Sequence, residues 1–302
     1  MPEWRPEVVV DADWAQRLIA GQFRELELGS IRLVGEGWDN TVWLVDELWV
    51  FRFPRRTIAV PAVERQVAVL PRLAPLLPLP IPTPTFVGRP ADGYPWPFFG
   101  VPFLHGREAP DAALADAPRA RLARALGTFL RALHHVDIGV AGGVLPVDPM
   151  RRGDLGYRVP RTLERLTEVE RLGIWRPHAR VRRLLEDARD VPARDALAVV
   201  HGDLHVRHLL VDDRARPAGI IDWDDLCLAD PAIDLPLFWS FLPPEGRPAF
   251  REAYGPVADA QLLRARVLAL FLCAALAAYG NQERMGNLER EAIGGLRRAS
   301  ID

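Results

Sequence analysis

The chain has 302 residues, of which 49% are hydrophobic and 26% are charged, and this composition excludes a disordered or fibrous protein. The formal net charge of -2 gives no support for a nucleic-acid or anionic-membrane partner. The two cysteines, Cys227 and Cys273, are far apart, and neither a signal peptide nor an 18-residue apolar run is evident, so we expect a cytoplasmic protein without an obligate protein partner.

The first part of the chain predicts a small sheet with two helices. Its acidic start and amphipathic spacing predict a helix over 11–27, and residues rich in β-branched and aromatic side chains predict strands over 31–34, 41–45 and 48–53. The turn between the first two strands contains Gly35 and Gly37. If Asp46 and Glu47 form a two-residue turn, Thr41 pairs with Arg52, which then lies level with the end of the glycine turn.

A glycine turn followed by a strand that carries a cation is how a kinase covers and neutralises nucleotide phosphates. Gly35, Gly37 and Arg52 are therefore candidates for a nucleotide site. After a helix over 60–73, prolines between 75 and 84 enforce an extended segment. Residues 94–106 predict a strand that runs into a connector, and we place the boundary between two lobes after residue 104.

The second part of the chain is predicted to be mostly helical, at about 113–135, 160–189, 246–255 and 260–298, with a strand-rich segment over 197–222. The sequence thus predicts an α+β fold of two lobes. Residues 1–104 form a small β-rich N-terminal lobe that binds nucleotide, and residues 105–302 form a larger helical lobe that carries out catalysis and binds substrate.

The strand-rich segment carries the chemistry. Residues 201–208 read His-Gly-Asp-Leu-His-Val-Arg-His, and residues 221–223 read Ile-Asp-Trp. If the intervening turn centres near Ala215, Leu209 pairs with Ile221, and His208 faces Asp222 closely enough for both to hold one metal ion. Asp203 presents a carboxylate nearby that need not bind the metal, which suits the base of a phosphoryl transfer.

These motifs, together with Asp-Pro-Ala-Ile-Asp-Leu at 230–235, resemble those of aminoglycoside and macrolide phosphotransferases, and the resemblance covers nearly the whole chain. It implies a bilobal protein-kinase-like fold, with Asp203 as the catalytic base, Asp222 as the metal-binding aspartate, and Asp234 as an acid that braces the catalytic loop. Most members carry asparagine where this chain has His208. The macrolide phosphotransferases resemble this chain in having histidine there.

The resemblance also implies nucleotide contacts. The position of Arg52 is usually lysine in the family, paired with a glutamate on the following helix, and this chain contains no lysine. Alignment with the family selects Gln66 as the helix partner, while Glu64 remains an alternative. In the connector, the backbone carbonyl of Pro102 and the backbone N–H of Leu104 correspond to the groups that hold an adenine ring.

The sequence therefore predicts a Mg²⁺-dependent phosphotransferase that moves the γ-phosphate of ATP or GTP to an alcohol group of a small hydroxylated molecule. A macrolide or aminoglycoside antibiotic is the expected acceptor. A metabolic kinase of the homoserine, choline or sugar type is an alternative, as is a degenerate kinase that only binds nucleotide or ligand. A metallohydrolase is disfavoured because no histidine follows residue 208.

Overall fold

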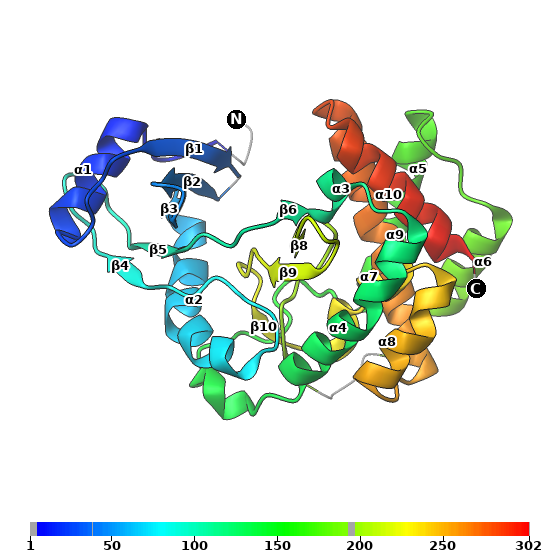
Figure 1. The fold of residues 1–302 in the computed structure, drawn as a ribbon. Coiled ribbons are helices and arrows are strands. Elements are labelled where there is room, and N and C mark those ends of the chain that lie inside the picture. The colour runs from blue at the N-terminus through cyan, green and yellow to red at the C-terminus, as the bar shows by residue number, and fades with distance from the viewer. Residues whose placement is uncertain (1–4, 38, 193–196, 302) are drawn as a thin grey trace. The chain divides into compact units, whose positions relative to one another are not determined.

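The computed structural model describes residues 5–37, 39–192 and 197–301 (Figure 1). The chain divides into two compact units, with the main break between Leu104 and His105. Two short segments are assigned to the other unit: Val140–Val144 belongs to the N-terminal unit, and Leu76–Leu79 belongs to the C-terminal unit.

The N-terminal unit is built on one antiparallel sheet whose strand order is β1-β2-β3-β5-β4. Two helices accompany the sheet. The strands are β1 (Ile31–Glu36), β2 (Asn40–Val45), β3 (Trp49–Pro54), β4 (Phe86–Gly88) and β5 (Phe98–Pro102), and the helices are α1 (Ala12–Gln22) and α2 (Val60–Leu73).

Aromatic side chains fill the core between the sheet and α1. The rings of Phe53 and Phe98 stack with centroids 4.5 Å apart, and Phe23 lies 5.1 Å from Phe86. Such pairs add about 0.5–1.5 kcal/mol each beyond the burial of their surface. The β-rich character expected for this part of the chain is confirmed. Phe53 and Phe98 lie on the predicted strands β3 and β5, whereas Phe86 lies on β4 and Phe23 at the end of α1.

The predicted register of the β2–β3 hairpin is wrong by one residue. Val45 pairs with Trp49 and Thr41 with Phe53, so Arg52 lies opposite Val42 rather than Thr41. The connection has three residues because the backbone N–H of Leu48 bonds to the carbonyl of Val45 at 3.0 Å, and strand pairing starts only after it. Trp38, in the predicted glycine turn, lies outside the described residues.

The C-terminal unit is mainly helical and holds two small sheets, of order β6-β8-β9 and β10-β7. Its strands are β6 (Arg107–Glu108), β7 (Ala198–Val200), β8 (Leu209–Val211), β9 (Pro217–Ile220) and β10 (Cys227–Ala229). Its helices are α3 (Ala109–Ala112), α4 (Asp116–His134), α5 (Leu155–Arg171), α6 (Ala179–Ala188), α7 (Pro236–Ser240), α8 (Arg247–Tyr254), α9 (Asp259–Gln282) and α10 (Gly286–Ser300).

Two of the long predicted helices are each split in two. Within the predicted helix 160–189, α5 ends at Arg171. Gly173 then adopts a left-handed φ of 72°, and the N–H of Ile174 donates back to the carbonyl of Val169. The segment 260–298 breaks at Arg284, which has a φ of 57°. Both breaks have the hydrogen-bond pattern that closes a helix through one left-handed residue.

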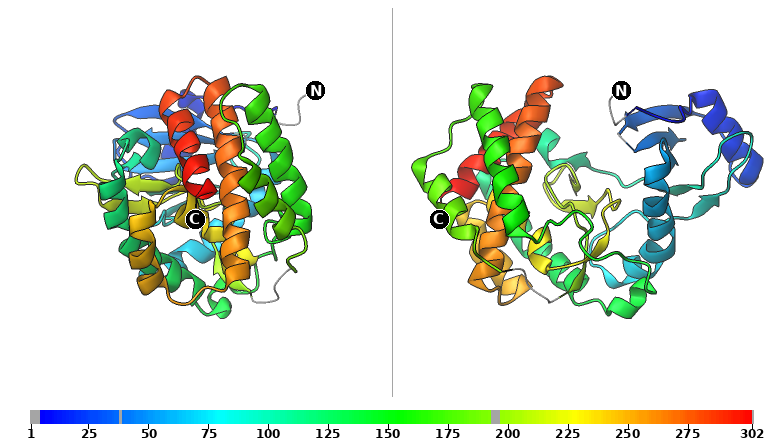
Figure 2. Two further views of the ribbon diagram at one scale, coloured as in Figure 1. Left: turned by 90° about the vertical axis from the view of Figure 1, so that its right-hand side faces the viewer. Right: turned by 180° about the vertical axis from the view of Figure 1, so that it is seen from behind.

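Helix α9 forms the centre of the C-terminal unit, between α5 and α10 (Figure 2). It is long and apolar enough to cross a membrane by length and composition, but 72% of its most apolar window is buried inside the protein. Its buried side chains pack with those of α5, α6 and α10 in one hydrophobic cluster. Burial of this kind is typical of a core helix.

Candidate active site

The loop after β7 is held by one buried carboxylate. Asp234 accepts hydrogen bonds from the backbone N–H groups of His201 (2.7 Å) and Gly202 (2.9 Å), and His134 Nε2 lies 3.1 Å from the same group. Burial alone would raise the pKa of Asp234, but the hydrogen bond and charge of His134 lower it below its usual value. Asp234 is therefore an ionised brace for the start of residues 201–208.

Gly202 is required by the shape of this loop. Its φ is 90°, a left-handed conformation that other residues rarely adopt, and a Cβ atom there would lie 2.2 Å from the carbonyl oxygen of Asp225. The glycine thus allows the chain to turn tightly against the segment after β9, and this turn carries Asp203 out of the core.

Asp203 follows this turn and is partly exposed, with 24% of its side chain accessible. Arg152 Nη2 donates to Asp203 Oδ1 at 3.0 Å and to Asp225 Oδ2 at 2.7 Å. Burial disfavours the charged guanidinium, but the two carboxylates raise the pKa of Arg152 above its usual value. The carboxylate of Asp203 is therefore held in one orientation with one edge accessible.

Arg152 is a site residue that the sequence did not reveal. It sits 51 positions before Asp203, in the loop that precedes α5. The carboxylate of Asp148 shapes that loop by accepting the backbone N–H groups of Arg152 (2.7 Å) and Gly153 (2.8 Å). In a chain whose only basic residues besides histidine are arginines, no local pattern distinguishes this one.

The side chains of His208 and Asp222 meet, with His208 Nε2 3.2 Å from Asp222 Oδ2. They do so in a register different from the predicted one. Leu209 pairs with Ile220 rather than Ile221, because Val211 pairs with Pro217, which centres the turn at Arg214 rather than Ala215. The register then shifts by one residue between Leu210 and Val211. Asp222 lies just beyond the paired residues and turns back toward His208 with a φ of 66°.

His208 faces hydrogen-bond acceptors on both sides of its ring. Its Nδ1 donates to the backbone carbonyl of Asp203 at 2.8 Å, and its Nε2 faces the carboxylate of Asp222. Burial alone would lower the pKa of His208, but the charge of Asp222 raises it above the usual value. Both ring nitrogens of His208 therefore face acceptors, and Nε2 can bind a metal only when it carries no proton.

The other two histidines of the loop differ in their surroundings. The backbone of Asp203 donates to Nδ1 of His201, whose Nε2 lies 2.9 Å from the carbonyl of Ile221. The ring of His205 lies 3.8 Å from that of His208, centroid to centroid, and its Nε2 is 3.8 Å from Asp203. Burial lowers the pKa of both His201 and His205, which favours the neutral form of both rings.

A divalent cation fits the donor atoms in this cluster. Ligand atoms of Asp203, His205 and His208 lie within 4.8 Å of one another, and the carboxylate of Asp222 is beside them. Carboxylate oxygens are the ligands that Mg²⁺ prefers, whereas imidazole suits softer transition metals. Asp222 would therefore be the main protein ligand for Mg²⁺, and His205 offers a further nitrogen beside it.

The predicted nucleotide residues all belong to the N-terminal unit. Gly35 lies near the end of β1, and the N–H of Gly37 donates to the carbonyl of Asn40 across the turn at 2.9 Å. Arg52 lies in β3, between Val42 of β2 and Phe99 of β5. The glycine turn and the cationic strand are therefore neighbours in the sheet, as the sequence predicted.

The buried face of α2 distinguishes between the two possible partners of Arg52. Gln66 is buried, on the same side as Val63, which packs against Phe99 and Val101 of β5. Glu64 is exposed. The position of Gln66 toward the sheet favours it over Glu64.

The connector runs on from β5 as an extended chain. The N–H of Phe103 donates to the carbonyl of Leu48 at 2.7 Å, so Phe103 directs its polar backbone groups toward β3. Backbone groups alternate in direction along an extended chain. The carbonyl of Pro102, at the end of β5, therefore points away from β3, and Leu104 lies in the connector beyond the strand.

Comparison with known proteins fits this arrangement. Residues 30–268 match the model of the phosphotransferase enzyme family, APH. The chain belongs to this family. It is 26% identical over 210 residues to the uncharacterised protein YcbJ of Bacillus subtilis (strain 168), and the match covers 63% of this chain and 62% of that relative.

Solved structures of the family share the fold. A GDP and kanamycin complex of APH(2")-IIia matches with a TM-score of 0.66 and 25% identity, over 94% of this chain and 97% of that one. Macrolide 2'-phosphotransferase type I matches with a TM-score of 0.56 and 25% identity, over 98% of this chain and all of that one. The expected kinase-like architecture, with a β-rich N-terminal part and a helical C-terminal part, is confirmed.

Proposed function

We propose that the protein transfers the γ-phosphate of ATP or GTP to an alcohol hydroxyl of a small molecule in a Mg²⁺-dependent reaction. The observation that carries this proposal is the geometry around Asp203. A partly exposed carboxylate is fixed by Arg152 at the end of a loop that Asp234 braces, and the His208–Asp222 pair lies directly beside it. Phosphoryl transfer requires positioned groups of this kind more than covalent chemistry by the protein.

Each residue has a defined part in the proposed reaction. Asp203 accepts the proton of the acceptor hydroxyl. The hydroxyl oxygen forms a bond to the γ-phosphorus, and the bond between the γ-phosphorus and the leaving nucleoside diphosphate breaks. Arg152 keeps the carboxylate of Asp203 oriented. Asp222, with His208 in its neutral form, would hold a divalent cation, which when bound neutralises phosphate charge.

The N-terminal unit supplies the proposed nucleotide contacts. Gly35 and Gly37 cover the phosphates, and Arg52 binds them with Gln66 as its neighbour on α2. Pro102 and Leu104 hold the nucleobase of ATP or GTP through their backbone groups. The GDP in the APH(2")-IIia complex, whose fold this chain shares, supports a nucleotide in this role, and the choice between ATP and GTP is part of the test below.

The related structures make an antibiotic the first acceptor class to examine, because one holds kanamycin and another is a macrolide phosphotransferase. A metabolic alcohol is the second candidate. We place the reaction in the cytoplasm, since Cys227 and Cys273 are both free thiols and both buried.

The proposal is tested by incubating the purified full chain with Mg²⁺, ATP or GTP, and a panel of acceptors. The panel comprises kanamycin, a macrolide, homoserine, choline, a free sugar and the hydroxy acids described below. We expect phosphate to appear on at least one acceptor. Nucleotide binding without transfer to any acceptor and without nucleotide hydrolysis would instead support a binding module.

A further inference from the structure

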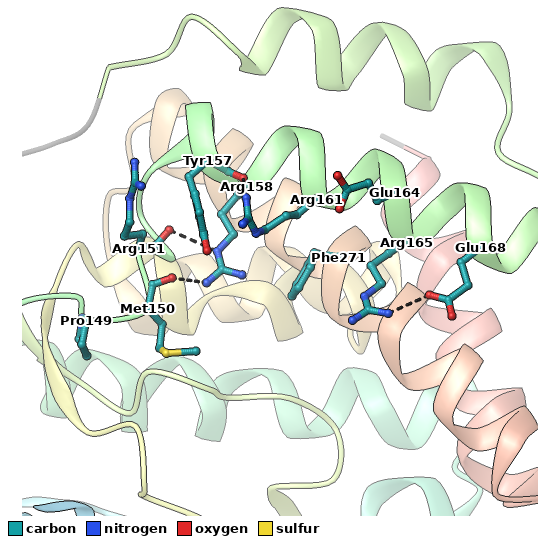
Figure 3. Close-up of a pocket in the computed structure, with 10 residues that line it drawn as sticks. All are labelled: Pro149, Met150, Arg151, Tyr157, Arg158, Arg161, Glu164, Arg165, Glu168 and Phe271. Carbon is teal, nitrogen blue, oxygen red and sulfur yellow. Dashed lines mark hydrogen bonds and ion pairs between the residues drawn. The ribbon is translucent and has the colours of Figure 1, made fainter. Parts of the chain in front are cut away.

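A cavity of about 510 Å³ lies in the C-terminal unit, between the loop before α5, α5 itself and α9 (Figure 3). This volume is within the range of small-molecule sites, about 300–1,000 Å³. Four arginines and two glutamates line it. They are Arg151, Arg158, Arg161, Arg165, Glu164 and Glu168.

Part of this charge is neutralised locally. Arg165 donates to Glu168 at 2.8 Å. Arg151 donates at 2.5 Å to Asp154, a residue that does not line the cavity. Once these pairs are set aside, Arg158 and Arg161 share the cavity with a single carboxylate, that of Glu164. The cavity therefore keeps a surplus of positive charge.

Arg158 is the most deeply placed of these cations. Its side chain is buried and donates to the backbone carbonyls of Met150 and Arg151, which carry no charge (Figure 3). Burial lowers the pKa of Arg158, and the positive charges of Arg152 and Arg161 lower it further. A negatively charged ligand would relieve this repulsion.

The cavity also offers aromatic surface. The guanidinium of Arg161 lies 3.5 Å from the centre of the Tyr157 ring, and that of Arg158 lies 5.1 Å from the centre of Phe271. These contacts fix the arginines against flat rings. A ligand that combines an anionic group with an apolar portion would contact both kinds of surface.

The cavity adjoins the candidate active site through the chain itself. Arg151 lines the cavity, and Arg152, the next residue, binds Asp203 at 3.0 Å. Neighbouring Cα atoms are about 3.8 Å apart. An acceptor in the cavity therefore lies next to the segment that positions the proposed base.

We propose that this cavity binds the acceptor, and that the acceptor is an anionic hydroxylated molecule with an apolar portion, its carboxylate or phosphate group held by Arg158 and Arg161. This inference rests on the proposed phosphotransferase function. A polycation such as kanamycin would meet repulsion from the same arginines. The substrate class thus differs from that of the aminoglycoside-binding relative.

Four probes with one skeleton test the charge preference. Mandelate, mandelamide and 2-amino-1-phenylethanol each carry a phenyl ring beside a secondary alcohol, and differ in charge from negative through neutral to positive. A fourth, α-hydroxybenzylphosphonate, distinguishes a phosphate-type group from a carboxylate. Calorimetry on the full chain without nucleotide should show one of the two anions binding most tightly and the cation least. Equal or reversed affinities, or no binding by either anion, would overturn the proposal.

Matched variants locate the binding. Arg161→Gln should weaken binding of the preferred anion about tenfold, the usual effect of losing one charge-assisted hydrogen bond, and leave the nucleotide dissociation constant unchanged. Arg176→Gln, at an exposed arginine outside the cavity lining, is the control. Circular dichroism confirms folding, and Arg161→Lys, which keeps the charge, should retain more affinity than Arg161→Gln. If an anion binds both Arg161 variants with the affinity that it has for the unaltered protein, it does not bind in this cavity.

These measurements separate the two proposals. Calorimetry without nucleotide reports only on the cavity, whereas hydrolysis of nucleotide or transfer to any acceptor reports on the phosphotransferase function. Transfer to kanamycin with no preference for anions would leave the function in place and remove the inference about the cavity.

Discussion

At the scale of single residues, Arg152 is the finding with the clearest consequence. It binds both Asp203 and Asp225 and does not itself need to touch the acceptor. We therefore expect Arg152→Gln to lower kcat about ten- to a hundredfold, since small misplacements of a reacting group are costly, with little change in the KM for nucleotide. Arg152→Lys should restore part of the rate. An equal loss in both variants, accompanied by a lower melting temperature, would indicate a purely structural role.

His208 leads to a prediction about the metal. An asparagine there can still donate to the carbonyl of Asp203 through its side-chain amide, and its oxygen suits Mg²⁺ better than imidazole does. His208→Asn should keep substantial activity and increase the ratio of the rate with Mg²⁺ to the rate with Mn²⁺. Loss of activity with every divalent ion would show that the imidazole is needed for another reason.

Single residues also show why parts of the site could not be predicted. Asp203, His208 and Asp222 stand in a recognisable order, so the sequence indicated them directly. Arg152 reaches Asp203 only because the chain brings together residues 51 positions apart. Such a contact depends on tertiary packing, and no periodicity or local spacing encodes it.

At the scale of elements, the turn after β7 depends on one glycine. Gly202→Ala would place a Cβ atom 2.2 Å from the carbonyl oxygen of Asp225 in a left-handed conformation. We expect a loss of at least about 2 kcal/mol in the free energy of unfolding, measured by denaturant titration.

Gly21 offers the matched control for that substitution. It lies inside α1, and nothing lies within 4 Å of a Cβ atom built there. Gly21→Ala should leave stability unchanged or raise it by up to about 1 kcal/mol, because alanine favours a helix. If both variants lost the same stability, the tight turn at Gly202 would not be the cause.

Elements were predicted better by type than by boundary or register. The strands over 31–53 and the helix over 60–73 follow from side-chain composition and spacing, and the structure contains them. Both predicted hairpin registers were wrong, because the exact position of each turn decides them. A hydrogen bond at Leu48 lengthens the first connection, and in the second hairpin Val211 already pairs with Pro217. The sequence prediction joined separate helices across Gly173 and Arg284, because the hydrogen bonds that end a helix there depend on a single left-handed residue.

At the scale of the whole molecule, the buried Asp234 predicts how stability depends on pH. Its pKa is lowered in the folded protein, so the stability that it contributes is fully present above the unfolded value of about 4 and is lost as pH falls through the folded value. Melting temperature should therefore fall steeply in acid. In Asp234→Asn, the melting temperature should be lower at neutral pH and should depend less on pH below 5. An unchanged acid profile in that variant would assign the acid sensitivity to other carboxylates.

The proposed nucleotide residues belong to one unit, and the proposed base, metal ligands and acceptor cavity belong to the other. The fold class followed from the sequence because composition changes from strand-rich to helix-rich along the chain. The proposed class of acceptor did not follow from the sequence. The cavity combines charged side chains of α5 with the ring of Phe271 on α9, and these come together only when the helices pack.

The central claim is that Asp203 is the base of a phosphoryl transfer, and the rate of transfer in Asp203→Ala tests it most directly. Asp213→Ala serves as the control, because Asp213 is almost fully exposed and forms a surface ion pair with Arg107. We predict that Asp203→Ala transfers phosphate about 10²- to 10⁴-fold more slowly than the unaltered protein and the control, with nucleotide binding retained. A transfer rate in Asp203→Ala equal to that of the control would contradict this account.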